Sequence, residues 1–142
     1  MADVQQPGPS PYLKPGFLVR SMINPIVGAF GLTPVLAVRG RTSGKWRSVP
    51  VNVLEAGGRR YLVAPRGNTQ WARNLRAAGG GELRRRRRRE AFRAVEVAGA
   101  EKEPLIRAYL ERWGRQVAAQ FGALPDPADH PVFRIEPREE RP

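Results

Sequence analysis

The chain has 142 residues and no cysteine, and its 25 lysines and arginines outnumber its 13 aspartates and glutamates, which gives a formal charge of +12. This length fits one domain and is too short for two independent cores. The lack of cysteine excludes a disulfide framework, an iron–sulfur cluster and a thiol nucleophile, and a single histidine argues against a multi-histidine metal site. The charge calls for an anionic partner. On charge alone this partner is a nucleic acid, an anionic membrane surface, or a phosphorylated or polycarboxylate small molecule.

The N-terminal part of the chain divides into two segments. Residues 1–16 carry four prolines and two glycines, so we expect a flexible lead-in to a domain that spans residues 17–136, with a tail at residues 137–142. Apolar residues recur every three or four positions from Phe17 to Phe30, which predicts an amphipathic helix on the core, with a membrane-surface helix as the alternative. We find no signal peptide and no long apolar run, so we expect a cytoplasmic protein, with peripheral association with an anionic membrane left open.

After Pro34 the pattern changes to short β-like runs separated by glycine-containing turns. Pro50 cannot donate a hydrogen bond to a ladder, so it must face a sheet edge, a bulge or a ligand. The basic turn at residues 40–45 joins the first two strands, and Gly57 and Gly58 turn the chain into the third. The predicted strands are residues 35–39, 46–54, 60–64, 82–89, 91–97 and 131–135.

Two further helices are predicted after the third strand. Thr69 is a good N-cap for a helix over residues 70–78, which Gly79 would end. A last helix over residues 103–121 places its apolar side chains on one face. The whole pattern predicts an α+β fold, a small split β-barrel of about six mostly antiparallel strands with about three flanking helices.

Two clusters of side chains suit an anionic ligand. Arg39, Arg41, Lys45 and Arg47 surround the turn at residues 42–44, where guanidinium groups, hydroxyls and backbone N–H groups suit a phosphate or several carboxylates. A solvated hairpin tip is the alternative interpretation.

The second cluster joins the loop at residues 64–68 to the helix that carries Trp71 and Asn74. Its glycine permits a close approach of the backbone, and a helix N-terminus offers N–H donors to an electron-rich group. The alternative is that Trp71 and Leu75 only fix the helix to the barrel.

The run Arg84–Arg89 is conspicuous but unspecific. On a strand these residues alternate sides, so we expect one set of three to point toward the barrel or a helix and the other toward water. No interleaved aromatics and no recognition helix accompany the run, which favours a solvated edge strand over a specific nucleic-acid binder. His130 lacks an acid, base or nucleophile partner, and no serine lies in a nucleophile elbow. We therefore assign no catalytic residue and no metal, and expect a cofactor to carry the chemistry.

Three stretches, residues 39–51, 61–67 and 71–77, together resemble the deazaflavin-dependent nitroreductase family of actinobacteria. The resemblance covers residues 20–136 and rests on a GRxSGxxRxxP block followed by a WxxNLxA block. It implies a split barrel of six or seven strands that binds coenzyme F420, a hydride carrier with a phosphate and an oligoglutamate tail. FMN is the nearest alternative cofactor.

The resemblance also implies which residues hold the cofactor. The basic turn and Arg47 match the positions that hold the phosphate and tail, residues 48–52 match the strand along the deazaflavin, and residues 64–67 match the loop against the ring. Tyr109, Trp113 and Phe121 are the aromatic candidates for the acceptor pocket. The matched cofactor residues are Arg41, Thr42, Ser43, Lys45, Arg47, Ser48, Val49, Pro50, Val51, Asn52, Ala64, Pro65, Arg66, Gly67, Gln70, Trp71 and Asn74.

The reaction that the resemblance implies is hydride transfer from reduced deazaflavin to a small lipophilic acceptor such as a quinone or a nitroaromatic compound, with any proton taken from solvent. We expect a monomer or a homodimer that binds no specific nucleic acid. The competing hypothesis is a non-enzymatic polyanion-binding module that uses Arg84–Arg89.

Overall fold

The computed structural model describes residues 33–138. The predicted lead-in at residues 1–16, the predicted helix from Phe17 to Phe30 and the tail from residue 139 lie outside the described residues. No helix among residues 33–138 combines the length and the apolar character needed to cross a membrane.

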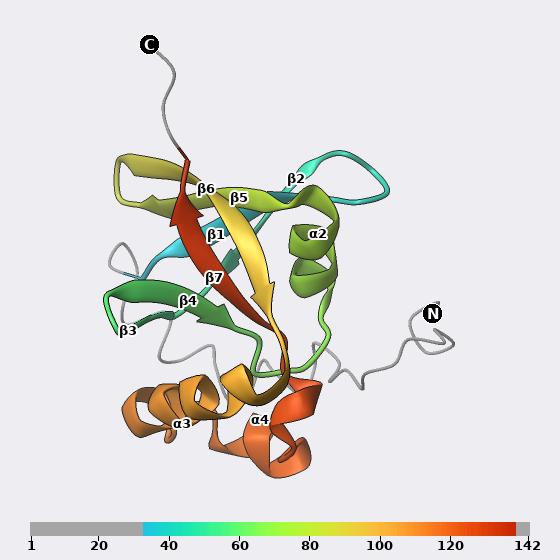
Figure 1. Ribbon diagram of the computed structural model, residues 1–142. Coiled ribbons are helices and arrows are strands. Elements are labelled where there is room, and N and C mark those ends of the chain that lie inside the picture. Colours follow the sequence, from blue (N-terminus) through green and yellow to red (C-terminus); the bar gives the residue numbers. More distant parts are fainter. Residues whose placement is uncertain (1–32, 139–142) are drawn as a thin grey trace.

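Seven antiparallel strands form one curled sheet (Figure 1). Its strand order is β2-β1-β5-β6-β7-β4-β3, so β2 and β3, which are consecutive in the chain, lie at opposite edges of the sheet. This topology confirms the predicted α+β split barrel, with seven strands instead of about six. The strands are β1 (Val35–Arg39), β2 (Trp46–Pro50), β3 (Val53–Ala56), β4 (Arg59–Val63), β5 (Gly80–Arg85), β6 (Arg88–Val97) and β7 (Val132–Pro137).

The predicted strand at residues 46–54 is wrong in one respect, because it is divided between β2 and β3. Val51 donates its backbone N–H to the carbonyl of Pro34 at 3.0 Å, which is the last bond along the β1 edge. Asn52 then turns toward Tyr109 and bonds to its hydroxyl. The chain therefore leaves one edge of the barrel and enters the other at residues 51–52, and Pro50 lies on an edge strand as predicted.

The second hairpin also turns at a different place from the predicted one. The predicted hairpin strands are residues 82–89 and 91–97, whereas in the structure Arg85 pairs with Arg88 and the turn falls at residues 86–87. Leu83 and Phe92 are buried inside the barrel, and burial of these two side chains fixes the register. Identical arginines contain no signal for register, and the turn places Arg86 at a φ of 55°.

Helix α2 (Gln70–Ala78) follows the prediction closely. The hydroxyl of Thr69 accepts a hydrogen bond from the N–H of Ala72, and Gly79, at a φ of 78°, donates its N–H to Leu75. The helix lies over one end of the curled sheet and buries Ala72 and Leu75 in the barrel interior (Figure 1).

The predicted helix at residues 103–121 is instead two helices, α3 (Lys102–Trp113) and α4 (Ala118–Ala123). The turn between them lets Val117 and Phe121 reach the same apolar cluster as Tyr109. Short 3₁₀ turns, η1 (Gly99–Glu101) and η2 (Pro127–Asp129), flank this pair.

Two apolar clusters result from this arrangement. The first fills the barrel interior, and the second joins the sheet to α3 and α4. The buried His130 connects the second cluster to the loop that follows β4, since its two ring nitrogens lie 2.9 Å from the carbonyl of Ala64 and 2.7 Å from that of Leu124. Its ring stacks on Phe121 at 4.0 Å. His130 is therefore placed as a buried connection between segments.

Candidate cofactor site

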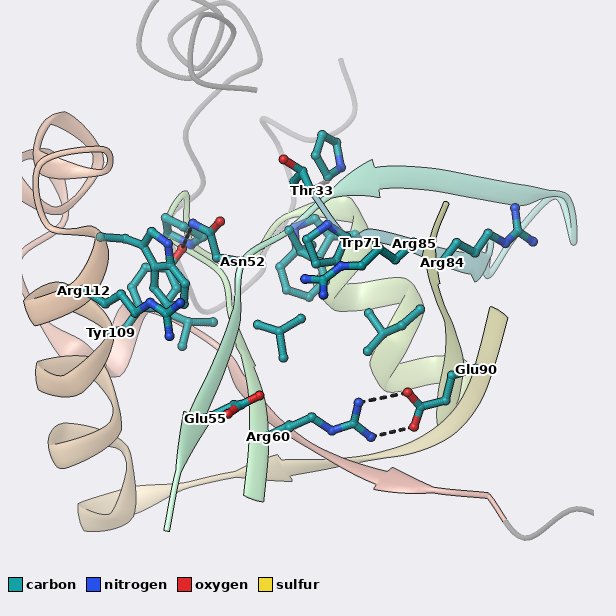
Figure 2. A pocket seen from close by; sticks show the side chains of 18 of the residues that line it. Thr33, Asn52, Glu55, Arg60, Trp71, Arg84, Arg85, Glu90, Tyr109 and Arg112 are labelled. Carbon is teal, nitrogen blue, oxygen red and sulfur yellow. Dashed lines mark hydrogen bonds and ion pairs between the residues drawn. The ribbon is translucent and has the colours of Figure 1, made fainter. Parts of the chain in front are cut away.

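A cavity of about 920 Å³ opens where the barrel is split (Figure 2). Strand ends from both edges of the sheet, α3 and the start of α2 contribute to its walls. Pockets of this size are typical of sites for small molecules and cofactors. Its apolar wall consists of Pro34, Pro50, Val51, Val53, Val63, Pro65, Trp71, Leu83 and Trp113.

Three of the matched stretches meet at this cavity. Pro50, Val51 and Asn52 lie at the crossing from β2 to β3, Pro65 follows β4, and Trp71 is in the first turn of α2. The ring of Trp71 is held against Phe133, with 6.3 Å between the ring centroids. Side chains that are far apart in the sequence thus form one apolar wall.

The basic turn between β1 and β2 is built by its own hydrogen bonds. Gly40 donates its N–H to the carbonyl of Lys45 at 2.8 Å, and Gly44 donates to Gly40 at 2.9 Å. The hydroxyl of Ser43 accepts the N–H of Lys45 at 3.1 Å. Arg39 donates to the carbonyl of Gly44 at 2.9 Å. The turn is therefore a defined structure, and its side chains from Arg41 to Lys45 are exposed.

One contact joins the two sequence blocks. The carboxamide oxygen of Asn74 accepts the backbone N–H of Arg41 at 3.0 Å and the Nη1 of the same residue at 2.7 Å. Asn74 is buried, with 5% of its surface exposed. Asn74 does not line the cavity with Trp71; it lies behind the basic turn and holds Arg41 against α2.

The remaining matched residues lie around the cavity without lining it. Arg47 and Ser48 are exposed on the edge strand β2, and Val49 packs against the barrel core. Ala64 is fully buried in that core. The loop continues through Arg66 and Gly67, which has a φ of 98°, to the exposed Gln70 at the start of α2. Thr42 is exposed in the turn.

Helix α3 supplies site residues that the motif blocks do not contain. Tyr109, Arg112, Trp113 and, beyond the helix, Gln116 line the cavity. Asn52 donates its Nδ2 to the Tyr109 hydroxyl at 3.2 Å, and burial raises the pKa of Tyr109 to about 12. Tyr109 therefore keeps its proton at neutral pH.

Two of the three aromatic acceptor candidates thus reach the cavity. The third, Phe121, lies in the cluster between the sheet and the helices. The periodicity of α3 could place Tyr109 and Trp113 on one face, but no local pattern connects that face to Asn52.

Charged residues surround the other end of the cavity. Arg60 donates two hydrogen bonds to the carboxylate of Glu90, at 2.9 Å and 2.6 Å (Figure 2). These bonds lower the pKa of Glu90 below its ordinary value. Six arginines and two glutamates line the cavity in all, which leaves it strongly cationic: Arg60, Arg84, Arg85, Arg88, Arg89, Arg112, Glu55 and Glu90.

A single curled sheet that is split between its edge strands, with an apolar and cationic cavity at the split, defines a split β-barrel of the flavin and deazaflavin oxidoreductase class. The chain belongs to the F420H2-dependent quinone reductase family, whose profile matches residues 19–122. The family consists of enzymes that use reduced F420, which confirms the expectation that a bound cofactor carries the chemistry.

Solved structures give the same fold. An F420-H2 dependent reductase (FDR-A) is 26% identical, with a TM-score of 0.54 and coverage of 73% of this chain and 94% of that one. A protein of unknown function from Agrobacterium tumefaciens is 21% identical, with a TM-score of 0.57, and the match covers 75% of this chain and 48% of that one. A FAD-binding protein from Mesorhizobium loti is 15% identical, with a TM-score of 0.52 and coverage of 89% and 91%. No curated protein matches the chain.

Proposed function

We propose that this protein reduces a quinone-type lipophilic acceptor with a hydride from F420H2, and that the cavity at the barrel split is where the two meet. The observation that carries the proposal is the convergence of Pro50–Val51, Pro65 and Trp71 on one apolar wall. All three belong to stretches that resemble deazaflavin-dependent enzymes, and the match to the quinone reductase family supports the same reaction.

The residues present fit F420 at both of its ends. A planar ring system suits the apolar wall beside Trp71, and strand β2 runs from Pro50 back to the basic turn. A chain of phosphate and carboxylate groups suits the exposed cations of that turn. In this proposal Arg41, Lys45 and Arg47 hold the phosphate and the tail, and Ser43, with Thr42 beside it, shapes the turn that presents them.

The loop and strand residues complete this assignment by position. Ser48 and Val49 continue β2 between the cations and the cavity, and Ala64 and Gly67 set the backbone of the loop beside the ring. Arg66 and Gln70 belong to the segment that leads from Pro65 to Trp71, where the backbone N–H groups at the N-terminus of α2 favour an electron-rich ligand edge.

When bound, F420H2 would supply a hydride, which carries two electrons and one proton to the quinone, and a second proton from solvent would complete the hydroquinone. The protein supplies position and exclusion of water. Tyr109, protonated and held by Asn52, presents a hydroxyl at the α3 side of the cavity that can donate a hydrogen bond to a quinone oxygen.

Titration of the full chain with F420 and with FMN tests the proposal directly. We expect micromolar binding of F420, and a Kd at least tenfold higher for Arg41→Ala/Arg47→Ala, because a hydrogen bond to a charged group contributes about 1.5–3 kcal/mol. The variant Arg59→Ala/Arg115→Ala removes two exposed arginines that do not line the cavity, and its Kd should stay within about twofold.

Because Arg41→Ala also breaks the contact with Asn74, the single variant Arg47→Ala serves as a second probe that leaves this contact intact. Absence of F420 binding, tighter binding of FMN, or equal Kd values for the wild type, Arg41→Ala/Arg47→Ala and Arg47→Ala would contradict the proposal. Oxidation of F420H2 by a panel of quinones then measures the reaction itself.

A further inference from the structure

The β5–β6 hairpin places two of its six arginines on the inner face of the barrel. Side chains alternate along a strand, so Arg85 shares the face of the buried Leu83, and Arg88 shares the face of Glu90 and the buried Phe92. Figure 2 shows Arg85 reaching toward Trp71, whereas Arg84 points away from it. Arg84, Arg85, Arg88 and Arg89 all line the cavity, and of these four Arg85 and Arg88 share the face of the buried Leu83 and Phe92.

These two arginines face each other directly. Arg85 and Arg88 are cross-strand partners in the ladder, and like charges in that position repel. Within residues 33–138, neither side chain forms an ion pair or a hydrogen bond with another side chain. Two guanidinium groups in this arrangement are suited to an anion that lies between them.

The nearby carboxylates do not fill that role. Glu90 accepts both of its hydrogen bonds from Arg60, and Arg88 acts on Glu90 only through its charge. Glu55 is the other carboxylate that lines the cavity, and its charge acts on Arg60. Arg85 and Arg88 therefore remain available beside the apolar wall.

The pair is remote from the residues assigned to the cofactor tail. Val35 pairs with Arg84 and Ala37 with Glu82, so the basic turn after Arg39 lies at the opposite end of the β1–β5 ladder from Arg85. Arg39 lies four positions along β1 from Val35, which corresponds to about 13 Å. A cofactor held by its phosphate at the turn leaves Arg85 and Arg88 to the second ligand.

We infer that Arg85 and Arg88 bind the acidic group of the acceptor, and that the enzyme prefers quinones that carry an ionised hydroxyl or carboxylate on the ring. This inference rests on the proposed function for the reaction, and adds the substrate class. The quinone ring lies in the same apolar cavity beside the ring of the cofactor, and the arginine pair binds the negative charge of the quinone.

A matched pair of ligands tests this preference. 2-Hydroxy-1,4-naphthoquinone is an anion at neutral pH, and 2-methoxy-1,4-naphthoquinone has the same ring system without the charge. The full chain is titrated with each quinone by tryptophan fluorescence, since Trp71 and Trp113 line the cavity, and by calorimetry. These binding measurements need no cofactor.

The variants compared are Arg85→Gln/Arg88→Gln and Arg86→Asn/Arg87→Gln, which remove the same charge from the same hairpin. Residues 86 and 87 form the turn and do not line the cavity. We expect the first variant to raise the Kd of the hydroxyquinone at least tenfold, with the methoxyquinone and the control variant within about twofold. The affinity for the hydroxyquinone should also fall as salt is added.

Three results would overturn the inference: equal losses for the two quinones, equal losses for the two variants, or a loss of F420 affinity in place of hydroxyquinone affinity. The last result would assign the arginine pair to the cofactor tail. The kcat/KM for each quinone with F420H2 is the second readout. Selective binding of the hydroxyquinone without oxidation of F420H2 would contradict the proposed function and leave the inference standing. Oxidation of F420H2 with no preference between the two quinones would contradict the inference and leave the proposed function standing.

Discussion

The contact between Asn74 and Arg41 gives the sharpest test of the site's construction. The buried carboxamide oxygen accepts one neutral bond from the backbone and one bond from the guanidinium. A neutral bond contributes about 1 kcal/mol. A bond to a charged group contributes about 1.5–3 kcal/mol when it is buried, and exposure of the Arg41 side chain reduces this to about 1 kcal/mol. We therefore expect Asn74→Ala to lower the free energy of unfolding by about 2–3 kcal/mol.

A double-mutant cycle separates the two bonds. Arg41→Ala removes only the guanidinium bond and should cost about 1 kcal/mol, and in the Asn74→Ala background it should cost almost nothing. Urea unfolding of the four proteins measures the coupling energy, which we expect to be about 1 kcal/mol. A coupling below about 0.3 kcal/mol, or equal costs for Asn74→Ala and Arg41→Ala, would refute the proposed role of the carboxamide.

Asn74→Asp tests whether the same contact matters for F420 binding. A carboxylate can accept both bonds, so the unfolding free energy at pH 7 should match or exceed that of the wild type. Its charge compensates that of Arg41, so the proposed cofactor site should lose F420 affinity, by about tenfold or 1.4 kcal/mol. Asn74→Asp should therefore weaken F420 binding without lowering the free energy of unfolding. A variant that loses both would indicate that Asn74 only supports the fold.

Three further substitutions test the barrel itself. Glu90→Gln removes the ion pair with Arg60, and since the folded-state pKa of Glu90 is lowered, the cost of under about 1 kcal/mol at pH 7 should begin to decrease as the pH falls below the ordinary value of 4.5, so urea unfolding should show a smaller cost at pH 3 than at pH 7. Gly80→Ala places a Cβ against the backbone carbonyl oxygen of Phe92 in β6, so it should cost more than about 2 kcal/mol by urea unfolding, whereas Gly122→Ala, with open space around it, should not destabilise. His130→Phe keeps an aromatic ring but removes the ring nitrogens beside the carbonyls of Ala64 and Leu124, of which Ala64 keeps the N–H of Gly67, so thermal unfolding should show a loss of about 1–3 kcal/mol, and an unchanged midpoint would contradict the connecting role.

Features of the fold that depend on local chemistry were predictable from the sequence. Thr69 and Gly79 mark the ends of α2 because a hydroxyl cap and a left-handed glycine are local requirements. Gly57 and Gly58, both at positive φ, mark the β3–β4 turn for the same reason. Features set by distant partners were not predictable. The break at residues 51–52 depends on Tyr109, more than fifty positions away.

The candidate site divides in the same way. Pro50, Pro65 and Trp71 could be found because each lies at a strand end or a helix start within a recognisable block. The block also contains Asn74, but only the fold reveals that this residue holds the basic turn and does not face the cavity. Arg112 and Gln116 carry no local signal, because the sheet and α3 must first be packed together before these residues reach the cavity.

The arginine hairpin shows how one repeated residue type acquires different roles through strand alternation. Arg84 belongs to the cavity lining, but its guanidinium bonds to Glu82 at 2.9 Å and lies over the ring of Trp46 at 5.6 Å, so it ties β5 across β1 to the edge strand on the outer face. Arg85, the next residue, faces the cavity. In the proposed arrangement the outer arginine stabilises the sheet and the inner one selects the ligand. Arg84→Gln should therefore lower the free energy of unfolding more than Arg85→Gln does, and Arg85→Gln should raise the Kd of the hydroxyquinone more than Arg84→Gln does, although each removes one charge from the same strand.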